Sequence, residues 1–269
     1  MYADDAQVYL SRPIGLSEDL VSRINEDLSR ISLWAESNGL KLNSSKTQAL
    51  PISHDDFNLE SLPKIVTNNT EISYENSVTS LGFVLNRKLS CKDHVNVTVS
   101  KMYSVIRKLW ASSDFLCTET KLQLVKSLCI PIMTYSGLIY GNMDSASKQK
   151  LQLVINSAAR YVYNQRKFDH ISMYSKRILN CDITNFFNVI NLVFIHKLIY
   201  TQCPQYLSSK LTYAHSSRTQ NLILPNFKYL VTSRTFFVSA VKLWNMLPPV
   251  IKTIQNQRLF KKAVRDFLC

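Results

Sequence analysis

The chain has 269 residues, and its 46% hydrophobic and 10% aromatic content is typical of a globular protein, which excludes a largely disordered one. Only 5 glycines are present, and neither a GxGxxG nor a GxxxxGK(S/T) motif occurs, which argues against a glycine-rich phosphate-binding loop. Residues 1–60 carry 5 Lys or Arg and 10 Asp or Glu, whereas residues 61–269 carry 27 and 9, a net charge of +18 that indicates a polyanionic partner such as nucleic acid, unless it only keeps the protein soluble.

The first predicted elements are a strand and a long helix. The stretch "DAQVYLS" (residues 5–11) is rich in β-forming residues and predicts a short strand. Residues 15–39 predict an amphipathic helix that Ser17 caps and Gly39 ends. Its apolar stripe consists of Leu20, Ile24, Leu28, Ile31 and the pair Trp34 and Ala35.

Short strands are expected between this helix and residue 90. The stretch "LKLNSSKTQALPIS" (residues 40–53) predicts a loop followed by a strand. Residues 68–90 predict two or three short strands, with turns at Asn68-Asn69 and Glu75-Asn76. From about residue 92 the hydrophobic period changes from 2 to 3.6, which predicts helices for most of the remaining chain.

The basic part of the chain is predicted to be mostly helical. Helices are expected at 91–110, 118–141 (interrupted at Pro131), 145–164, 169–180, 183–201, 233–247 and 255–268, with an extended segment at 216–229. The most apolar stretch, "ITNFFNVINLVFIHKLIY", is interrupted by Asn, His and Lys, so it predicts a buried helix and no transmembrane segment. The predicted fold class is α+β: a small α/β head at about 1–90 and a helical body at about 91–269.

Six cysteines bear on the cellular compartment. They form no CxxC pair, and none has a histidine at zinc-ligand spacing. The first 30 residues are acidic and lack the apolar core of a signal peptide. We therefore expect free thiols and an intracellular protein of the cytoplasm, the nucleus or both, which is not secreted.

Two adjacent carboxylates, Asp4 and Asp5, stand in the opening stretch "MYADDAQVYL". Like charges repel, so such a pair needs either a cation or full solvation, and a solvated terminus is the simpler alternative. A turn that presents carboxylates to a divalent metal suits phosphoryl transfer, because Mg²⁺ takes hard oxygen ligands. The four letters YADD are a weak signal by themselves.

Further stretches follow the YADD box in a characteristic order. They are "WAESNGLKLNSSKTQAL", "VTSLGFVLNRKLSCKDHV" and the tail from "SSRTQNLILP" to "WNMLPPVIKTIQNQRLFKKAVRDFL". In order and spacing, these stretches resemble the reverse transcriptase of a Jockey-like non-LTR (LINE-type) retrotransposon, from the second half of the palm onward. The resemblance implies a partial palm at 1–90, a helical thumb-like or connection region at 91–202 and the C-terminal region of such polyproteins at 203–269.

The resemblance also implies roles for individual residues. Asp4 is similar to the metal-binding catalytic carboxylate of the family's box, with Asp5 as its less direct neighbour, and the metal would be Mg²⁺ or Mn²⁺. Tyr2 would contact the primer end and the incoming nucleotide, and Lys46 would approach the nucleotide's phosphates, unless it is an exposed strand-edge lysine. Leu81-Gly82 resembles the primer-grip turn, the alternative being an ordinary hairpin turn.

The family's thumb tracks a duplex of RNA template and DNA primer. Candidates for phosphate contacts in this chain are Lys101, Arg107, Lys108, Lys121 and Lys126. For each of them singly, a solvated helix face is the competing interpretation.

The family's polymerase also uses an earlier palm aspartate and fingers, which precede the YADD box. Because the box begins at residue 2, we expect a C-terminal fragment of an RNA-directed DNA polymerase that is inactive as written and lacks the endonuclease domain and any CCHC knuckle. One alternative is a non-catalytic basic nucleic-acid-binding protein, and another is a pseudogene product without function. An in-frame genomic continuation upstream of Met1 would instead restore the full enzyme.

Overall fold

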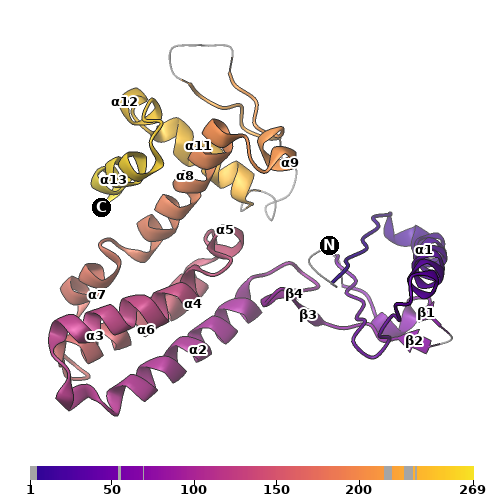
Figure 1. The fold of residues 1–269 in the computed structure, drawn as a ribbon, viewed down its shortest axis with the longest axis horizontal. Helices are drawn as coiled ribbons and strands as arrows, with labels where there is room; N and C mark the ends of the chain where they lie inside the picture. Colours follow the sequence, from indigo (N-terminus) through magenta and orange to yellow (C-terminus); the bar gives the residue numbers. More distant parts are fainter. Residues whose placement is uncertain (1–4, 54–55, 69, 215–219, 227–232, 234) are drawn as a thin grey trace. The chain divides into compact units, whose positions relative to one another are not determined.

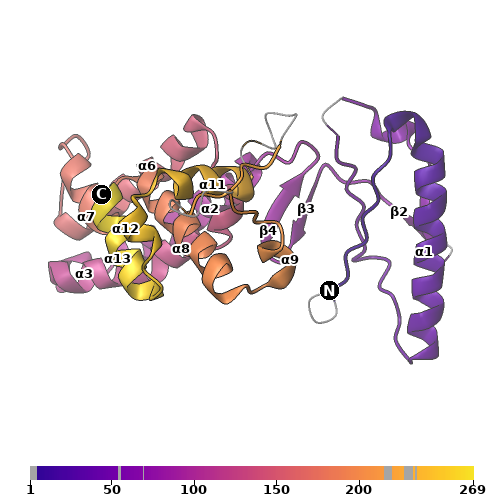
Figure 2. The same cartoon turned by 90° about the horizontal axis from the view of Figure 1, so that it is seen from above.

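The computed structural model describes residues 5–53, 56–68, 70–214, 220–226, 233 and 235–269 (Figures 1 and 2). The chain has a mixed α+β architecture and divides into two compact units, Met1–Ser90 and Cys91–Cys269. In the described residues, every named β-strand lies in the first unit.

The first unit is built on one long helix and a hairpin. Helix α1 (Ser17–Ser37) follows the 3-10 turn η1 (Ile14–Leu16), and its Val21 packs with Ile65 and Ile72 of a two-stranded antiparallel sheet. That sheet consists of β1 (Ile65–Thr67) and β2 (Thr70–Ile72). The predicted stripe residues Leu20, Ile24 and Leu28 pack against this cluster, whereas Trp34 is exposed.

Asn25 joins α1 to the open edge of β1. Its Nδ2 donates to the carbonyl of Lys64 at 3.2 Å, and its Oδ1 accepts from the amide of Val66 at 3.0 Å. These bonds satisfy edge groups of a strand that would otherwise need water or another strand. Figure 1 shows β1 and β2 next to α1.

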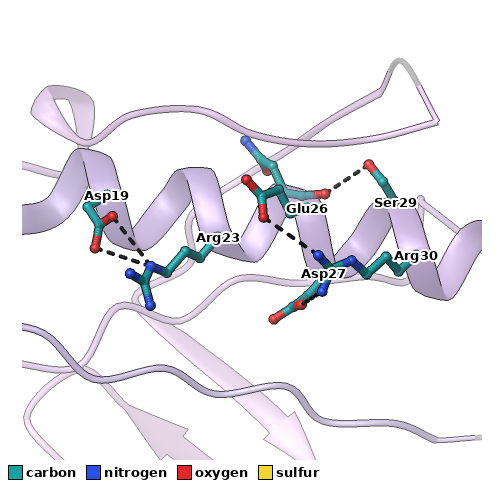
Figure 3. A network of polar contacts seen from close by, with 7 residues as sticks. Asp19, Arg23, Glu26, Asp27, Ser29 and Arg30 are labelled. Carbon is teal, nitrogen blue, oxygen red and sulfur yellow. Dashed lines mark hydrogen bonds and ion pairs between the residues drawn. The ribbon is translucent and has the colours of Figure 1, made fainter.

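The outward face of α1 carries ion pairs whose two members are one helical turn apart, as Figure 3 shows. Arg23 lies 3.4 Å from Asp19, and Arg30 lies 3.7 Å from Asp27 and 4.0 Å from Glu26. All five side chains are largely exposed, so each pair stabilises the helix by only about 0.3–0.5 kcal/mol.

A second hairpin completes the first unit. Strands β3 (Ser77–Ser80) and β4 (Phe83–Asn86) pair antiparallel, with Ser80 opposite Phe83. The two-residue connection is Leu81-Gly82, whose φ angles of 47° and 76° are those of a type I′ turn. A short 3-10 turn, η2 (Leu59–Ser61), precedes β1.

Three local predictions for the first unit are wrong. Residues 6–13 are irregular, and in place of the strand expected within 40–53 there is only an isolated bridge from Ala49 to Tyr74, because neither segment has a ladder of partner residues in the described part. Ser17 is the first residue of α1 and does not cap it, since η1 carries the chain into the helix. Gly39 does end the helix: its φ is 70°, and Leu40 donates to the carbonyl of Ala35 at 2.8 Å, as in a Schellman motif.

In its described residues, the second unit consists of helices and their connections, with one isolated antiparallel bridge between Tyr213 and Leu222 (Figure 1). Its elements are α2 (Lys92–Trp110), η3 (Ser113–Phe115), α3 (Thr118–Leu124), η4 (Val125–Cys129), α4 (Ile130–Thr134), α5 (Gly137–Tyr140), α6 (Ser145–Tyr163), α7 (Ser172–Leu179), α8 (Ile183–Thr201), α9 (Gln205–Ser208), α11 (Phe236–Met246), α12 (Pro249–Lys252) and α13 (Gln257–Leu268). The predicted helices at 91–110, 145–164, 183–201, 233–247 and 255–268 are therefore present within a few residues. Part of the extended segment predicted at 216–229 lies outside the described residues.

The predicted helix at 118–141 continues through Pro131 by way of a wider turn. The turn before the proline, η4, is a π-helix, and α4 then begins with Pro131 in its first turn. A proline lacks the N–H that the preceding α-helical turn would use, so a wider turn accommodates it. The helix ends at Thr134, and Ser136 turns the chain with a φ of 57°.

Helix α8 is the central element of the C-terminal part. Its Leu192 and Ile195 pack with Val241 and Trp244 of α11 and with Phe260 of α13 in one cluster. Residues 172–201 are long and apolar enough to cross a bilayer by length and composition, but half of their most apolar stretch is buried inside the protein. Because residues on both sides of position 202 share this cluster, 91–269 form one packed unit.

Candidate nucleic-acid interface

Helix α2 has one buried and one solvent-facing side. Val95, Met102 and Ile106 are buried as the hydrophobic period predicts, and they face α4, η4 and α6. His94 and Thr98 are buried on the same side, which the sequence reasoning missed because both are polar. The remaining side of the helix exposes its cations to solvent.

Lys101, Arg107 and Lys108 are all exposed on α2. Lys101 and Lys108 are seven residues apart, so they lie on nearly the same face, about 10 Å apart along the axis. Arg107 and Lys108 stand in the last turn, where cations also favour the negative end of the helix dipole.

Helix α6 adds a cation beside the beginning of α2. Lys150 Nζ donates to Asn96 Oδ1 at 2.6 Å, which fixes this exposed lysine next to the solvent face of α2. The proximity of a fourth cation was not predicted, because no sequence spacing links α6 to α2.

Of the two remaining lysines predicted to contact phosphate, one is unsuitable. Lys121 is only 2% exposed; its Nζ donates to Asn164 Oδ1 at 2.7 Å and lies 5.5 Å from the centre of the Tyr161 ring. Such a lysine holds α3 against the end of α6 and is not available to a duplex. Lys126, by contrast, is exposed on η4.

The whole second unit carries a large net positive charge, as a phosphate-binding surface requires. Residues 91–269 carry 24 Lys or Arg and 7 Asp or Glu, a net charge of +17. Residues 183–265 contain no acidic residue and 11 basic ones. Few carboxylates are therefore available to neutralise these cations internally.

The charge of Lys101 also acts on a neighbour within α2. Burial lowers the pKa of His94, and the positive charge of Lys101 lowers it further. The His94 ring is packed edge-on against Tyr140, with 5.0 Å between ring centroids. His94 is thus a neutral core residue and not a phosphate ligand.

The predicted metal site falls mostly outside the described residues. Tyr2 and Asp4 belong to 1–4, and Asp5, the first residue described, is exposed. In the described part of the chain, no three His, Cys, Asp or Glu side chains gather as a metal site would require. Asp5 alone does not fit Mg²⁺ or Mn²⁺ binding, because these ions take several oxygen ligands.

The other predicted residues of the first unit lie in two turns. Lys46 is exposed in a turn, in which its backbone amide donates to the carbonyl of Asn43 at 3.1 Å. Lys46 is therefore not a strand-edge residue. Leu81 and Gly82 are the exposed hairpin turn between β3 and β4. The side chain of Gln7 donates to Ser80 Oγ, which ties the segment just after Asp5 to the end of this hairpin.

Comparison of this chain with protein-family models, with curated proteins and with solved structures finds no match.

Proposed function

We propose that residues 91–269 bind nucleic acid through its phosphate backbone, without sequence preference, as the thumb of a reverse transcriptase holds an RNA–DNA duplex. The observation that carries the proposal is the exposed set Lys101, Arg107 and Lys108 on the solvent face of α2, in a unit of net charge +17. Cations on a helix of this kind bind by releasing counterions, so affinity depends on salt and not on base sequence.

The test is the salt dependence of binding to a labelled RNA–DNA duplex of about 20 base pairs, measured by fluorescence anisotropy. A contact with about 5 phosphates gives a log–log slope near −4 to −5. The triple variant Lys101→Gln, Arg107→Gln, Lys108→Gln should reduce the steepness of that slope by about 2 to 3.

A matched control removes three other exposed cations of the same unit: Lys167, Lys176 and Arg177. This control should keep a slope close to that of the unchanged protein. Equal losses in both triple variants would show that binding has no preferred surface and would overturn the assignment to α2. A flat salt response of the unchanged protein would overturn nucleic-acid binding altogether.

We further propose that the chain derives from the reverse transcriptase of a non-LTR retrotransposon, with Asp4 and Asp5 as ligands of Mg²⁺ or Mn²⁺. The ordered motifs support this origin, and so does the Gln7–Ser80 hydrogen bond, which joins the segment after the YADD box to the predicted primer-grip turn. The 269-residue chain carries one of the two carboxylate positions that the family's site uses, so we expect it not to polymerise by itself. The non-catalytic binding protein is the competing function.

Primer extension on an RNA template separates these two functions. The purified chain is assayed with Mg²⁺ and with Mn²⁺, beside an Asp4→Asn variant as background. No extension above that background is expected, because loss of catalytic groups costs orders of magnitude in rate. Template-dependent extension that Asp4→Asn abolishes would establish the polymerase instead.

A further inference from the structure

An open apolar groove of about 430 Å³ runs along α8 in the second unit. One wall is α13, and the other is formed by α4 and α5. The apolar lining residues are Ile130, Leu138, Phe186, Val189, Ile190, Val193 and Phe194. Most of these side chains are only half-buried, so the groove is an apolar face that the described helices leave partly uncovered.

Cations stand along the groove and no carboxylate lines it. Lys261 and Arg265 are one turn apart on α13, and Lys197 lies on α8. Gln257 precedes Lys261 by one turn of α13, so the α13 wall of the groove presents polar or basic groups over about 12 Å. No ion pair with a carboxylate neutralises Lys197, Lys261 or Arg265 in the residues that the structure describes.

We propose that this groove binds an acidic amphipathic helix of a partner protein. Apolar side chains spaced i, i+3 or i+4, and i+7 would cover the floor, and carboxylates beside them would meet Lys261, Arg265 and Lys197. The groove is thus a protein-interaction surface separate from the phosphate-binding face of α2. The first unit's own acidic helix, α1, has already buried its apolar stripe against β1 and β2.

The distribution of charge favours a helix over a lipid. A fatty acid has one carboxylate and would match cations gathered at one end of a cavity. Here the cations are spread over the length of the groove, so their occupant carries negative charge at several points.

The floor of the groove disfavours nucleic acid. A single strand binds by stacking its bases on exposed aromatic rings. Only Phe186 and Phe194 are aromatic among the lining residues, and Phe194 already packs edge-on against Phe236 at 5.2 Å between centroids. A floor of branched aliphatic side chains is matched by leucine-like residues of a protein helix.

The probe is a fluorescein-labelled synthetic peptide of about 18 residues, with leucines at i, i+4, i+7 and i+11 and glutamates beside them. Anisotropy titrations at physiological salt compare it with a shuffled peptide of the same composition that has no apolar face. The amphipathic peptide should bind, and the shuffled one should bind about tenfold or more weakly. Equal affinity of the two peptides would overturn the proposal.

Two charge-reversal variants on α13 locate the contact. Lys261→Glu with Arg265→Glu should weaken binding of the acidic peptide about tenfold or more. The control Arg258→Glu with Lys262→Glu makes the same change of charge on the same helix at exposed positions that do not line the groove, and its effect should stay within about twofold. Equal effects of the two variants would mean that only the general charge of α13 matters.

A basic version of the peptide, with lysine in place of glutamate, is the control for misfolding of the charge-reversal variant. It should bind the Lys261→Glu, Arg265→Glu variant more tightly than the unchanged protein, which an unfolded variant would not do. Displacement of the acidic peptide by dodecanoate or by a short single-stranded DNA at micromolar concentration would overturn the proposal in favour of a lipid or of nucleic acid.

Discussion

The cysteines of the second unit lie in contrasting environments that decide their reactivity. Cys117 is exposed, and hydrogen bonds from the hydroxyl and the amide of Thr120 lower its pKa. Cys129 and Cys181 are buried, and burial raises the pKa of the first to about 11 and that of the second to about 12. The thiolate is the reactive form, so these thiols differ in both charge and access.

Cysteine alkylation checks this contrast. At pH 7.5, iodoacetamide should modify Cys117 about tenfold or more faster than Cys129 or Cys181, as followed by mass spectrometry. A Thr120→Val variant should slow the modification of Cys117 and leave exposed Cys203 unchanged. Equal rates for Cys117 and Cys181 in the folded protein would contradict the described burial.

His196 and His94 are both neutral core residues. His196 Nε2 donates to the carbonyl of Ile254 at 2.7 Å, while its Nδ1 is buried without a hydrogen-bond partner in the described residues. Burial lowers the pKa of His196, and burial together with Lys101 lowers that of His94. A proton on either ring would place a positive charge in the buried core, which costs free energy.

The free energy of unfolding should therefore decrease as the pH is lowered. Both folded pKa values are below the ordinary value of 6.5, so the unfolded chain binds more protons once the pH drops below about 6.5. Stability is fully present above that pH, and each histidine removes up to about 1.4 kcal/mol per pH unit below it. Urea unfolding at pH 7.5 and 5.5 measures this change, and His196→Gln should reduce it; a greater stability at pH 5.5 would contradict it.

At the scale of elements, the helix α1 depends on a half-buried stripe. Ile24 packs against the cluster of Val21, Ile65 and Ile72, so Ile24→Ala should destabilise the packing of α1 on β1 and β2 by about 1–2 kcal/mol. Faster hydrogen exchange of α1 amides measures the loss. Leu33→Ala, at a side chain that is 67% exposed, is the control and should leave exchange unchanged.

The end of the same helix depends on a left-handed residue. An added Cβ at Gly39 would meet nothing within 4 Å, so its φ of 70° alone makes substitution costly. Gly39→Ala should destabilise α1 by about 1 kcal/mol. Gly15→Ala, where φ is not positive and space is open, should cost nothing in the same exchange measurement.

At the scale of the whole molecule, stability should follow burial. Tyr9 and Phe168 are each 91% exposed in chain segments outside the helices and strands, whereas Tyr140, Tyr161 and Trp244 are fully buried. Brief digestion with chymotrypsin should therefore cut after Tyr9 and Phe168 early and leave the three buried sites intact. Early cleavage after Trp244 would contradict the cluster around α8.

Local sequence determined most of the helices of the second unit. The 3.6-residue period of α2 and α6 is a property of short stretches of chain, and so is the long apolar run that forms α8. Two of these helices begin at caps that neighbouring residues supply, because Asp144 accepts from the amide of Ser147 at 2.7 Å and Asp182 from that of Asn185 at 2.9 Å. The turn at Leu81-Gly82 was likewise predicted from a short stretch of sequence.

Only the tertiary structure decided which of these residues face solvent and which lie near one another. Lys101 and Lys121 are both helical lysines by sequence, but the end of α6 covers Lys121 and leaves it bonded to Asn164. The stretch at 5–11 has β-forming residues but no ladder of partners, and a strand forms only with partners. The groove along α8 joins residues 130 and 265, whose proximity depends on long-range packing that no local pattern encodes.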